Sequence, residues 1–362
     1  MEQQMSCIFV FMWSAFIHSH AFVALLRRSK GLLWRAPSGP SCMLGKKLSM
    51  IGAGLLIMSW LNAQADTSSL PATKRIDLVK STTSRVWLVA GVSAIGYGGS
   101  LIILNNTWYK NYAHTPFHTF NDSKEWLQVD KAGHGWTAFN TARASASLWY
   151  WAGLDEKKSA LVGGLTGAAY LTAIEFLDAH SAKWGWSWSD IGANIFGSGF
   201  FVSQKLLWGD ERIQYKFSFH HKDYHDAVLN KRADDLFGKV WYERMLKDYN
   251  AQTYWLSANL RSFFSQSNLP PWLNISVGYG ADGMFGGFEN RWTDGDPGFT
   301  IDRTEIPRRR QFYVAPDVDF TKIRTNKKWL RTLFFCMNAF KCPAPALMMD
   351  SKGRMKGYVI YF

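Results

Sequence analysis

The stretch that decides the fold runs from Asp130 to Gly197. It opens with DKAGH at 130–134, passes through a glycine-rich apolar run ending in EFLD at 175–178, and closes with SDIGANIFG at 189–197. Ionisable side chains are set at intervals into apolar, tryptophan-rich sequence, and burying them is costly unless they find partners. We therefore expect these side chains to meet inside the protein.

Helical spacing places several of these side chains on shared faces. Gly163, Gly167 and Glu175 are separated by multiples of four residues, and small residues at this spacing let two helix backbones approach closely. Asp190 and Asn194, four residues apart, share a face of the following helix. The spacing predicts that Glu175 lies on a tightly packed seam between helices.

The sequence predicts one polar network with a structural or ligand-binding role, whose members are Asp130, Lys131, His134, Glu175, Asp178, Ser189, Asp190, Asn194 and Gly197. His134, Glu175 and Asp190 are the candidates for general acid–base catalysis. Alternatively, Asp130 and Ser189 cap helices, Lys131 neutralises Glu175 or Asp190, and the network fixes the register of the helices. No metal or cofactor is predicted, and whether the protein is an enzyme stays open.

These residues resemble the motif of a known family. Asp-Lys-x-x-His, a glycine-rich helix with an acidic residue and Ser-x-x-Asp-x-x-x-Asn-x-x-Gly are similar to the YfiM-like predicted periplasmic lipoproteins, a family of unknown function. The matching positions are Asp130, Lys131, His134, Glu175, Ser187, Asp190, Asn194 and Gly197. The order also resembles the VanZ-like membrane proteins, although those have Glu-x-x-Gln where this chain has Glu175 to Asp178. The resemblance covers about residues 125–210 and implies a periplasmic location.

The N-terminal region predicts export. Lys46 and Lys47 precede an apolar run at 48–61 and the sequence Ala-Gln-Ala at 63–65, which together indicate a signal peptide at residues 43–65. Residues 1–42 are either a spurious extension from an early start codon, which we favour, or contain an extra membrane helix at Cys7 to Leu26. No lipobox cysteine follows the apolar run, so lipid anchoring is not predicted.

Composition and charge favour the cell envelope. The 362 residues include 18 Trp, and Trp is common at bilayer interfaces, although a Trp-rich soluble core is an equal alternative. The net charge of +13 is concentrated at 27–47 and 303–331 without a nucleic-acid-binding motif. Such a chain suits anionic lipid head groups or an acidic envelope polymer. We predict membrane lipid or envelope components as partners, and no nucleic acid.

The residues after the signal peptide divide into two regions with different periods. Residues 66–250 contain the charge-free run Val86 to Leu104 and three further apolar helical segments, which predicts a four- to five-helix bundle. Residues 251–362 show apolar residues at period two, as expected for antiparallel strands. The predicted fold class is mainly α, an apolar four- to five-helix bundle followed by a smaller antiparallel β-rich region.

The predicted function is that of an exported, membrane-associated envelope protein of uncharacterised activity, in the periplasm or outer membrane, with a structural or lipid- or glycan-related role. The alternative is a membrane-embedded hydrolase or transferase that acts on lipid-linked substrates through His134, Glu175 and Asp190. Cys336 and Cys342 could form a disulfide in an oxidising compartment.

Overall fold

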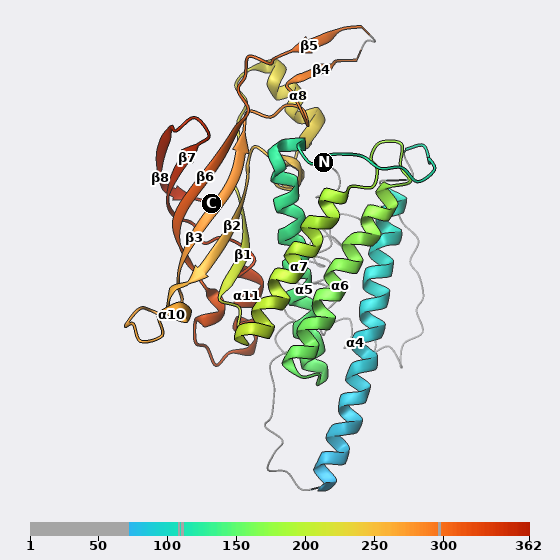
Figure 1. The fold of residues 1–362 in the computed structure, drawn as a ribbon, viewed down its shortest axis with the longest axis vertical. Coiled ribbons are helices and arrows are strands. Elements are labelled where there is room, and N and C mark those ends of the chain that lie inside the picture. The colour runs from blue at the N-terminus through green and yellow to red at the C-terminus, as the bar shows by residue number, and fades with distance from the viewer. Residues whose placement is uncertain (1–71, 108, 110–111, 296–297) are drawn as a thin grey trace, which may run out of the picture.

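Four long helices lie beside one curved antiparallel sheet (Figure 1). The structure is a computed structural model that describes residues 72–107, 109, 112–295 and 298–362. The expected signal peptide at 43–65 and the expected extension at 1–42 lie outside these residues. Within them, no disulfide joins Cys336 and Cys342.

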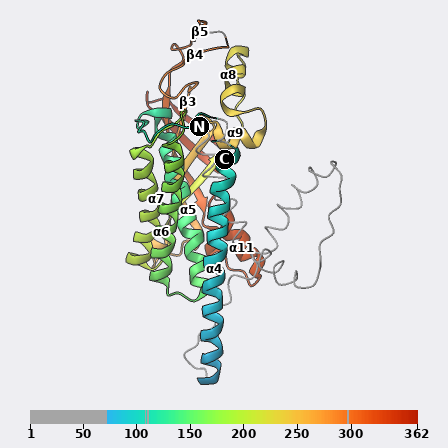
Figure 2. The same ribbon diagram turned by 90° about the vertical axis from the view of Figure 1, so that its right-hand side faces the viewer.

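The long helices are α4 (Ala72–Thr107), α5 (Val129–Ala152), α6 (Glu156–Asp178) and α7 (Trp188–Trp208). The helices α5, α6 and α7 pack closely on one another, and α4 packs along α5 and α6. One end of α4 extends well beyond the other helices (Figures 1 and 2). The apolar segments identified in the sequence thus form the helices of this layer.

Glycines bring the backbones of α5, α6 and α7 together. A Cβ atom at Gly163 would lie 2.5 Å from the carbonyl oxygen of Ala142, and one at Gly197 would collide with the backbone of Gly135. Only glycine permits an approach this close. The predicted glycine seam is therefore present, with α5 as the partner of both α6 and α7.

The main sheet has six antiparallel strands in the order β1-β2-β3-β6-β7-β8. Its strands are β1 (Ile213–Phe219), β2 (Gln252–Asn259), β3 (Leu273–Asp282), β6 (Arg309–Val318), β7 (Ala344–Asp350) and β8 (Met355–Tyr361). A separate hairpin consists of β4 (Arg291–Thr293) and β5 (Thr300–Asp302). The shorter helices are η4 (Glu125–Gln128), α8 (Ala227–Phe237), α9 (Trp241–Lys247), α10 (Leu260–Phe263), η5 (Phe320–Lys322) and α11 (Lys328–Met337).

The predicted mainly α class is wrong. Helices contain 48% of the described residues and strands 22%, so the sheet is a layer of its own beside the helices. Trp136 and Phe139 of α5 pack against Tyr215, Phe217 and Tyr254 of the sheet in one shared core. The prediction failed at β1 because its alternating Gln and Lys residues resemble a polar connector. The division of the chain at residue 250 stays a prediction.

The two faces of the sheet differ in chemistry. The inner face carries Lys216, Ser257 and Asp317, and the curvature of the sheet brings Lys216 Nζ of β1 within 2.9 Å of Asp317 Oδ2 of β6. Lys341 Nζ lies 3.6 Å from Asp317 Oδ1. The outer face carries residues such as Val277, whose neighbours across the strands are also apolar. Burying the polar face inside the curve leaves the apolar face outside.

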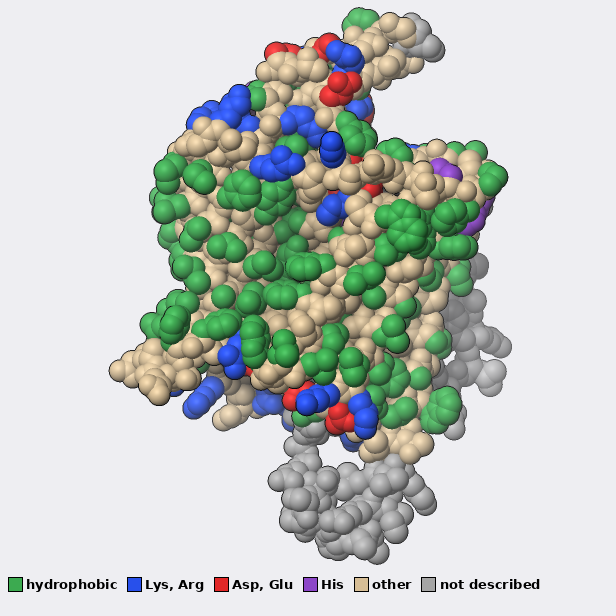
Figure 3. Space-filling model, viewed as in Figure 1, with side chains coloured by type: hydrophobic (Ala, Val, Ile, Leu, Met, Phe, Trp, Pro, Cys, Tyr) green, Lys and Arg blue, Asp and Glu red, His purple; other side chains and the backbone are tan. Residues whose placement is uncertain are grey.

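An apolar surface continues from the helices onto the sheet. On the helices it includes Leu165, which is 71% exposed, and on the outer face it includes Val277, Val314 and Leu347. Figure 3 shows these regions as one apolar face, with Lys and Arg gathered beyond one end and charges of both signs beyond the other. We call it the apolar belt, comprising the exposed apolar residues of α6, α7 and the outer face of β3, β6 and β7.

Two helices in the described part of the chain are long and apolar enough to cross a membrane, by length and composition alone. They are the segment Thr82–Asn106 of α4 and the helix Glu156–Asp178. The first contains the charge-free run predicted at Val86 to Leu104. The second also packs against α5 and α7, so part of its apolar content is explained by contacts with these helices.

Candidate functional site

The polar residues singled out in the sequence gather where α5 and α7 begin and α6 ends. Asp130, Lys131 and His134 come from the first turns of α5, and Glu175 comes from the last turn of α6. Asp190 and Asn194 come from the first two turns of α7. The chain reverses direction between these helices, so their polar ends meet. Almost all of these side chains are buried.

Lys131 is the centre of the ionic part of the site. Its Nζ atom lies 2.6 Å from Asp122 Oδ2, 2.9 Å from Asp130 Oδ2 and 2.6 Å from Asp190 Oδ1. One ammonium group thus contacts three buried carboxyl groups, so the site carries excess negative charge when all three are ionised.

His134 lies deeper, between α6 and α7. Its Nδ1 atom is 3.1 Å from Asn194 Oδ1 and 3.8 Å from Glu175 Oε1, and its Nε2 atom is 3.6 Å from Asp190 Oδ1. The contacts with the two carboxyl groups are longer than hydrogen bonds. Proton transfer from Asp190 to Glu175 through His134 would need a bridging water or a small movement of the side chains.

Several atoms of this deeper part have no hydrogen-bond partner within the described residues. They are His134 Nε2, both carboxyl oxygens of Glu175, Asp190 Oδ2 and Asn194 Nδ2. Buried polar atoms without a partner are rare in folded proteins and usually indicate water, an ion or a ligand. The sequence network therefore has an incompletely satisfied centre.

The charges around Lys131 set the protonation of the site. Burial alone would raise the pKa of Asp130, but Lys131 and His134 hold it below the usual range. Burial alone would lower the pKa of Lys131, and the three carboxyl groups raise it instead. Burial raises the pKa of Asp190 to about 7 despite the charges of His134 and Lys131. Asp190 is thus the group of this ionic cluster that exchanges a proton near neutral pH.

The remaining predicted members lie at the edges of the site. Asp178 accepts a hydrogen bond of 2.7 Å from Tyr109. Ser189 donates to Asp122 Oδ1 at 2.6 Å and is not the cap of α7. That role belongs to Ser187, whose Oγ accepts from the backbone N–H of Asp190. Gly197 provides the contact with Gly135.

Two important members were missed in the sequence. Asp122 precedes α5 in an irregular loop, yet it accepts from Lys131, Ser187 and Ser189. Tyr249 follows α9 and donates to Asp130 Oδ1 at 2.7 Å from the far side of α5. Neither residue lies on a periodic helix face with the others, so no spacing signal was available for them. The hydroxyl of Ser187, the N-cap of α7, needs a hydrogen-bond acceptor, and a search for that acceptor could have pointed to Asp122.

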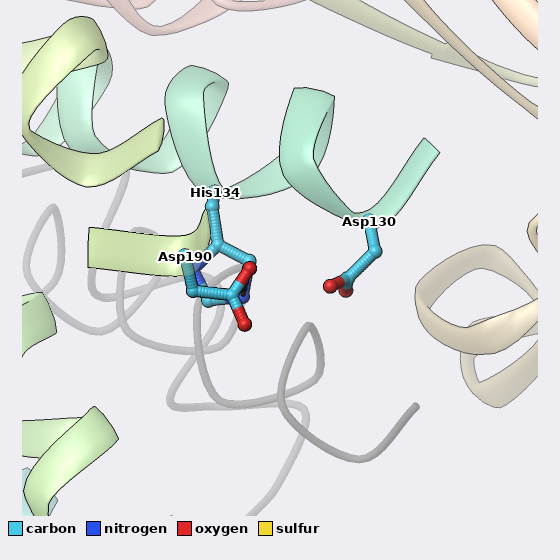
Figure 4. A group of neighbouring side chains, drawn as sticks. All are labelled: Asp130, His134 and Asp190. Carbon is cyan, nitrogen blue, oxygen red and sulfur yellow. Dashed lines mark ion pairs between the residues drawn. The ribbon is translucent and has the colours of Figure 1, made fainter. Parts of the chain in front are cut away.

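Asp130, His134 and Asp190 are the residue types that could hold a metal ion, with one ligand atom of each within 4.8 Å of the others. Figure 4 shows His134 directed toward Asp190, with Asp130 one turn earlier on α5. Lys131 already contacts both carboxyl groups at hydrogen-bond distance. Because its ammonium group takes the position of a cation among them, the arrangement favours an internal ion cluster over a metal centre.

Comparison with protein families places this site inside a matched segment. Residues 119–205 match the model of a family described as predicted periplasmic lipoprotein (DUF2279). The segment includes Asp122 and every predicted member of the network, but it ends before β1. The finer YfiM-like and VanZ-like resemblances are not shown. No curated protein and no solved structure matches the chain. About a quarter of the chain, including the whole helical part of the site, is thus similar to a family of predicted periplasmic lipoproteins, which supports a location in the periplasm or cell envelope.

Proposed function

We propose that the protein is a membrane-associated component of the cell envelope, with a structural or lipid-related role, that contacts lipid through its apolar belt. The observation that carries this proposal is the continuity of exposed apolar side chains between α6, α7 and the outer face of the sheet. Monomeric soluble proteins rarely expose a continuous apolar patch larger than a few hundred Å². A protein surrounded by water on every side would gain nothing from exposing a continuous apolar surface of this kind.

The dimensions of the belt fit a bilayer. The 23 residues of α6 correspond to about 35 Å at 1.5 Å per residue. The 10 residues of β6 correspond to about 33 Å of strand. Both lengths match the hydrocarbon thickness of about 30 Å. Figure 3 shows charged side chains beyond both ends of the belt. Lys158 lies in the first turn of α6 and Arg310 is the second residue of β6, as expected where lipid head groups begin.

We assign lipid contact to β3, β6 and β7 because their backbone groups form hydrogen bonds within the sheet. Each of these strands has a neighbour on both sides, with β6 paired to β7 over Gln311–Val314, so the backbone N–H and C=O groups of the paired stretches are satisfied within the sheet. Unpaired backbone groups are not tolerated in hydrocarbon. The outer face of these strands can therefore meet lipid without such a cost.

In this proposal the polar network holds the three inner helices in one register. Lys131 connects α5 to α7, and its contact with Asp122 fixes the preceding loop. A buried ionic cluster of this kind penalises any sliding of the helices, because a shift separates the charges. The alternative of a hydrolase or transferase acting through His134, Glu175 and Asp190 finds no support in the matching family, which is described only as a predicted periplasmic lipoprotein.

Membrane fractionation tests the proposal. The full chain, expressed with its own N-terminal region, is expected to stay in the membrane pellet after carbonate extraction. Leu161 and Leu165 are 50% and 71% exposed on α6, and changing both to Lys should move a large share of the protein to the soluble fraction. Lys158→Gln, at an exposed charged position of the same helix, is the matched control and should stay in the pellet.

Complete release of the wild-type chain by carbonate would overturn the proposal. So would unchanged retention of the Leu161→Lys, Leu165→Lys variant, provided that its circular dichroism spectrum equals that of the wild type. An uncleaved signal sequence would also keep the protein in the membrane pellet. The extraction is therefore repeated on protein whose mature N-terminus has been determined by mass spectrometry.

A further inference from the structure

A groove runs along the outer face of the sheet beside the start of α5. It has a volume of about 810 Å³ and is lined by Ala132 of α5 and by residues of all six strands of the main sheet. Ligand sites of small molecules typically enclose about 300–1,000 Å³. The groove opens within the apolar belt, with Val277, Val314 and Leu347 among its exposed lining residues.

The lining of the groove has no polar group that needs water. Its only polar side chains are four tyrosines, and each hydroxyl already donates to an acceptor in the protein. Tyr215 donates to Ala132 O at 2.9 Å, Tyr254 to Gln252 Oε1 at 3.1 Å, Tyr279 to Leu127 O and Tyr313 to Gln311 Oε1 at 3.0 Å. The occupant that fits such a surface is a hydrocarbon chain.

One end of the groove is basic. Arg310 lies on the outer face of β6, two residues before the lining residue Phe312, and it contacts Tyr279. Arg310 Nη2 also donates to Gln128 Oε1 at 2.5 Å, which ties the strand to the start of α5. Arg308 lies two residues before Arg310 in the chain. Figure 3 shows basic side chains beyond this end of the apolar face.

Arg308 has donors that the protein does not use. Its Nη2 atom donates to Gly287 O at 2.5 Å, but its Nε and Nη1 atoms are buried and have no hydrogen-bond partner within the described residues. The acidic groups that face Arg308 are Glu125 and Glu289, and burial raises the pKa of Glu125. Two guanidinium donors of Arg308 therefore lack an acceptor within the described residues, four positions before the groove-lining residue Phe312 in the chain.

We infer that the groove binds an anionic phospholipid, with an acyl chain along the outer face of the sheet and the phosphate at Arg308 and Arg310. Guanidinium groups are well suited to phosphate because their paired donors match two phosphate oxygens. The inference rests on the proposed membrane contact and deepens it, because it assigns a head-group preference to one place on the belt. A belt without this site would contact all lipids alike.

Native mass spectrometry of the full chain purified in mild detergent tests the inference. Dioleoyl phosphatidylglycerol is compared with dioleoyl phosphatidylcholine, which has the same acyl chains and no net charge. We expect phosphatidylglycerol to be retained about tenfold more strongly, from the two arginines. Glycerol phosphate in excess should not displace it, because the acyl chain supplies part of the binding.

Two variants separate the head-group contact from the groove. Changing Arg308 and Arg310 together to Gln should reduce phosphatidylglycerol retention to that of phosphatidylcholine. Val314→Trp, at a half-exposed position on the groove, should reduce the retention of both lipids. The control is Arg291→Gln, which removes an exposed arginine paired with Asp302 on the β4–β5 hairpin and should change neither.

Equal retention of the two lipids by the wild type would overturn the inference while leaving the proposed membrane contact intact, since carbonate extraction tests that contact separately. Wild-type selectivity in the double arginine variant would also overturn it, as would unchanged retention in Val314→Trp or full displacement by glycerol phosphate. The inference would be supported if the double arginine variant lost its preference for phosphatidylglycerol over phosphatidylcholine while Arg291→Gln kept it.

Discussion

Two buried polar networks among the described residues are satisfied to different degrees. In the sheet, Asp317 lies between Lys216 and Lys341 and also accepts from Ser257 at 2.6 Å and from the backbone N–H of Cys342 at 2.9 Å. In the helices, Glu175 has no hydrogen-bond partner for either carboxyl oxygen within the described residues. One network is closed by its own residues, and the other is left open at its centre.

The difference suggests different roles for the two networks. A fully bonded buried ion cluster stabilises one geometry and does nothing else, as expected of the interior of a curved sheet. Unpartnered atoms have to be supplied with water, a proton or a ligand. The segment that matches a known family covers the open network and excludes the closed one. We therefore assign a stabilising role to the closed network inside the sheet, and we expect the open network of the helices to take up water, a proton or a ligand.

The largest effect is expected from breaking the closed network. Asp317→Asn leaves Lys216 and Lys341 buried without a negative partner, and removing one partner of a buried ion pair typically costs about 3–5 kcal/mol. The free energy of unfolding, measured by urea denaturation in detergent, should fall by that amount. Asp302→Asn, which affects an exposed pair with Arg291, is the control and should leave stability nearly unchanged, because solvent screens exposed ion pairs.

A somewhat smaller loss is expected from the centre of the open network. Lys131→Met leaves Asp122, Asp130 and Asp190 without their shared cation, and we expect a cost of about 2–4 kcal/mol. The cost is below that of Asp317→Asn because the carboxyl groups can take up protons. The same urea measurement checks it, with Lys158→Met at an exposed pair as the control. A loss larger at low pH than at high pH would contradict this account.

The third prediction concerns pH. Asp190 has a pKa of about 7 in the folded protein, against an ordinary aspartate value of 3.8 for the unfolded chain. Between these values the folded state binds more protons than the unfolded state, so the contribution of Asp190 to stability decreases as pH rises. One group gives a slope of at most about 1.4 kcal/mol per pH unit, which ends above pH 7.

Because other buried carboxyl groups also titrate, the measurement is a difference between two proteins. The free energy of unfolding of wild type minus that of Asp190→Asn should fall from pH 5 to pH 7 and then stay level. The lowered pKa of Asp130 acts in the opposite direction, but only below its usual range, so it lies outside this window. A difference that stays constant between pH 5 and pH 7 would show that Asp190 is already ionised.

The sequence predicted the part of this picture that depends on local spacing. Helical periodicity identified α4 to α7 and the glycine seam, and it placed Glu175, Asp190 and Asn194 on inward faces. The fold class was wrong because strand β1 alternates polar residues toward an interior that only the curvature of the sheet creates. Asp122 and Tyr249 were missed because they reach the site from loops 8 and 119 residues away from Asp130, Tyr249 donating to it directly. Their positions follow from packing, and no local pattern encodes them.

The smallest effect is expected from Glu175→Gln, and it is the sharpest comparison between the two networks. The amide keeps the shape of the side chain, and no hydrogen bond within the described residues is lost because neither carboxyl oxygen has a partner there. We expect the free energy of unfolding to change by less than about 1 kcal/mol. Membrane retention and lipid binding can then be measured on a folded protein, so that any loss of them reports on the open site itself. If Glu175→Gln instead costs as much as Asp317→Asn, then Glu175 is ionised and paired, and the two networks are of the same kind.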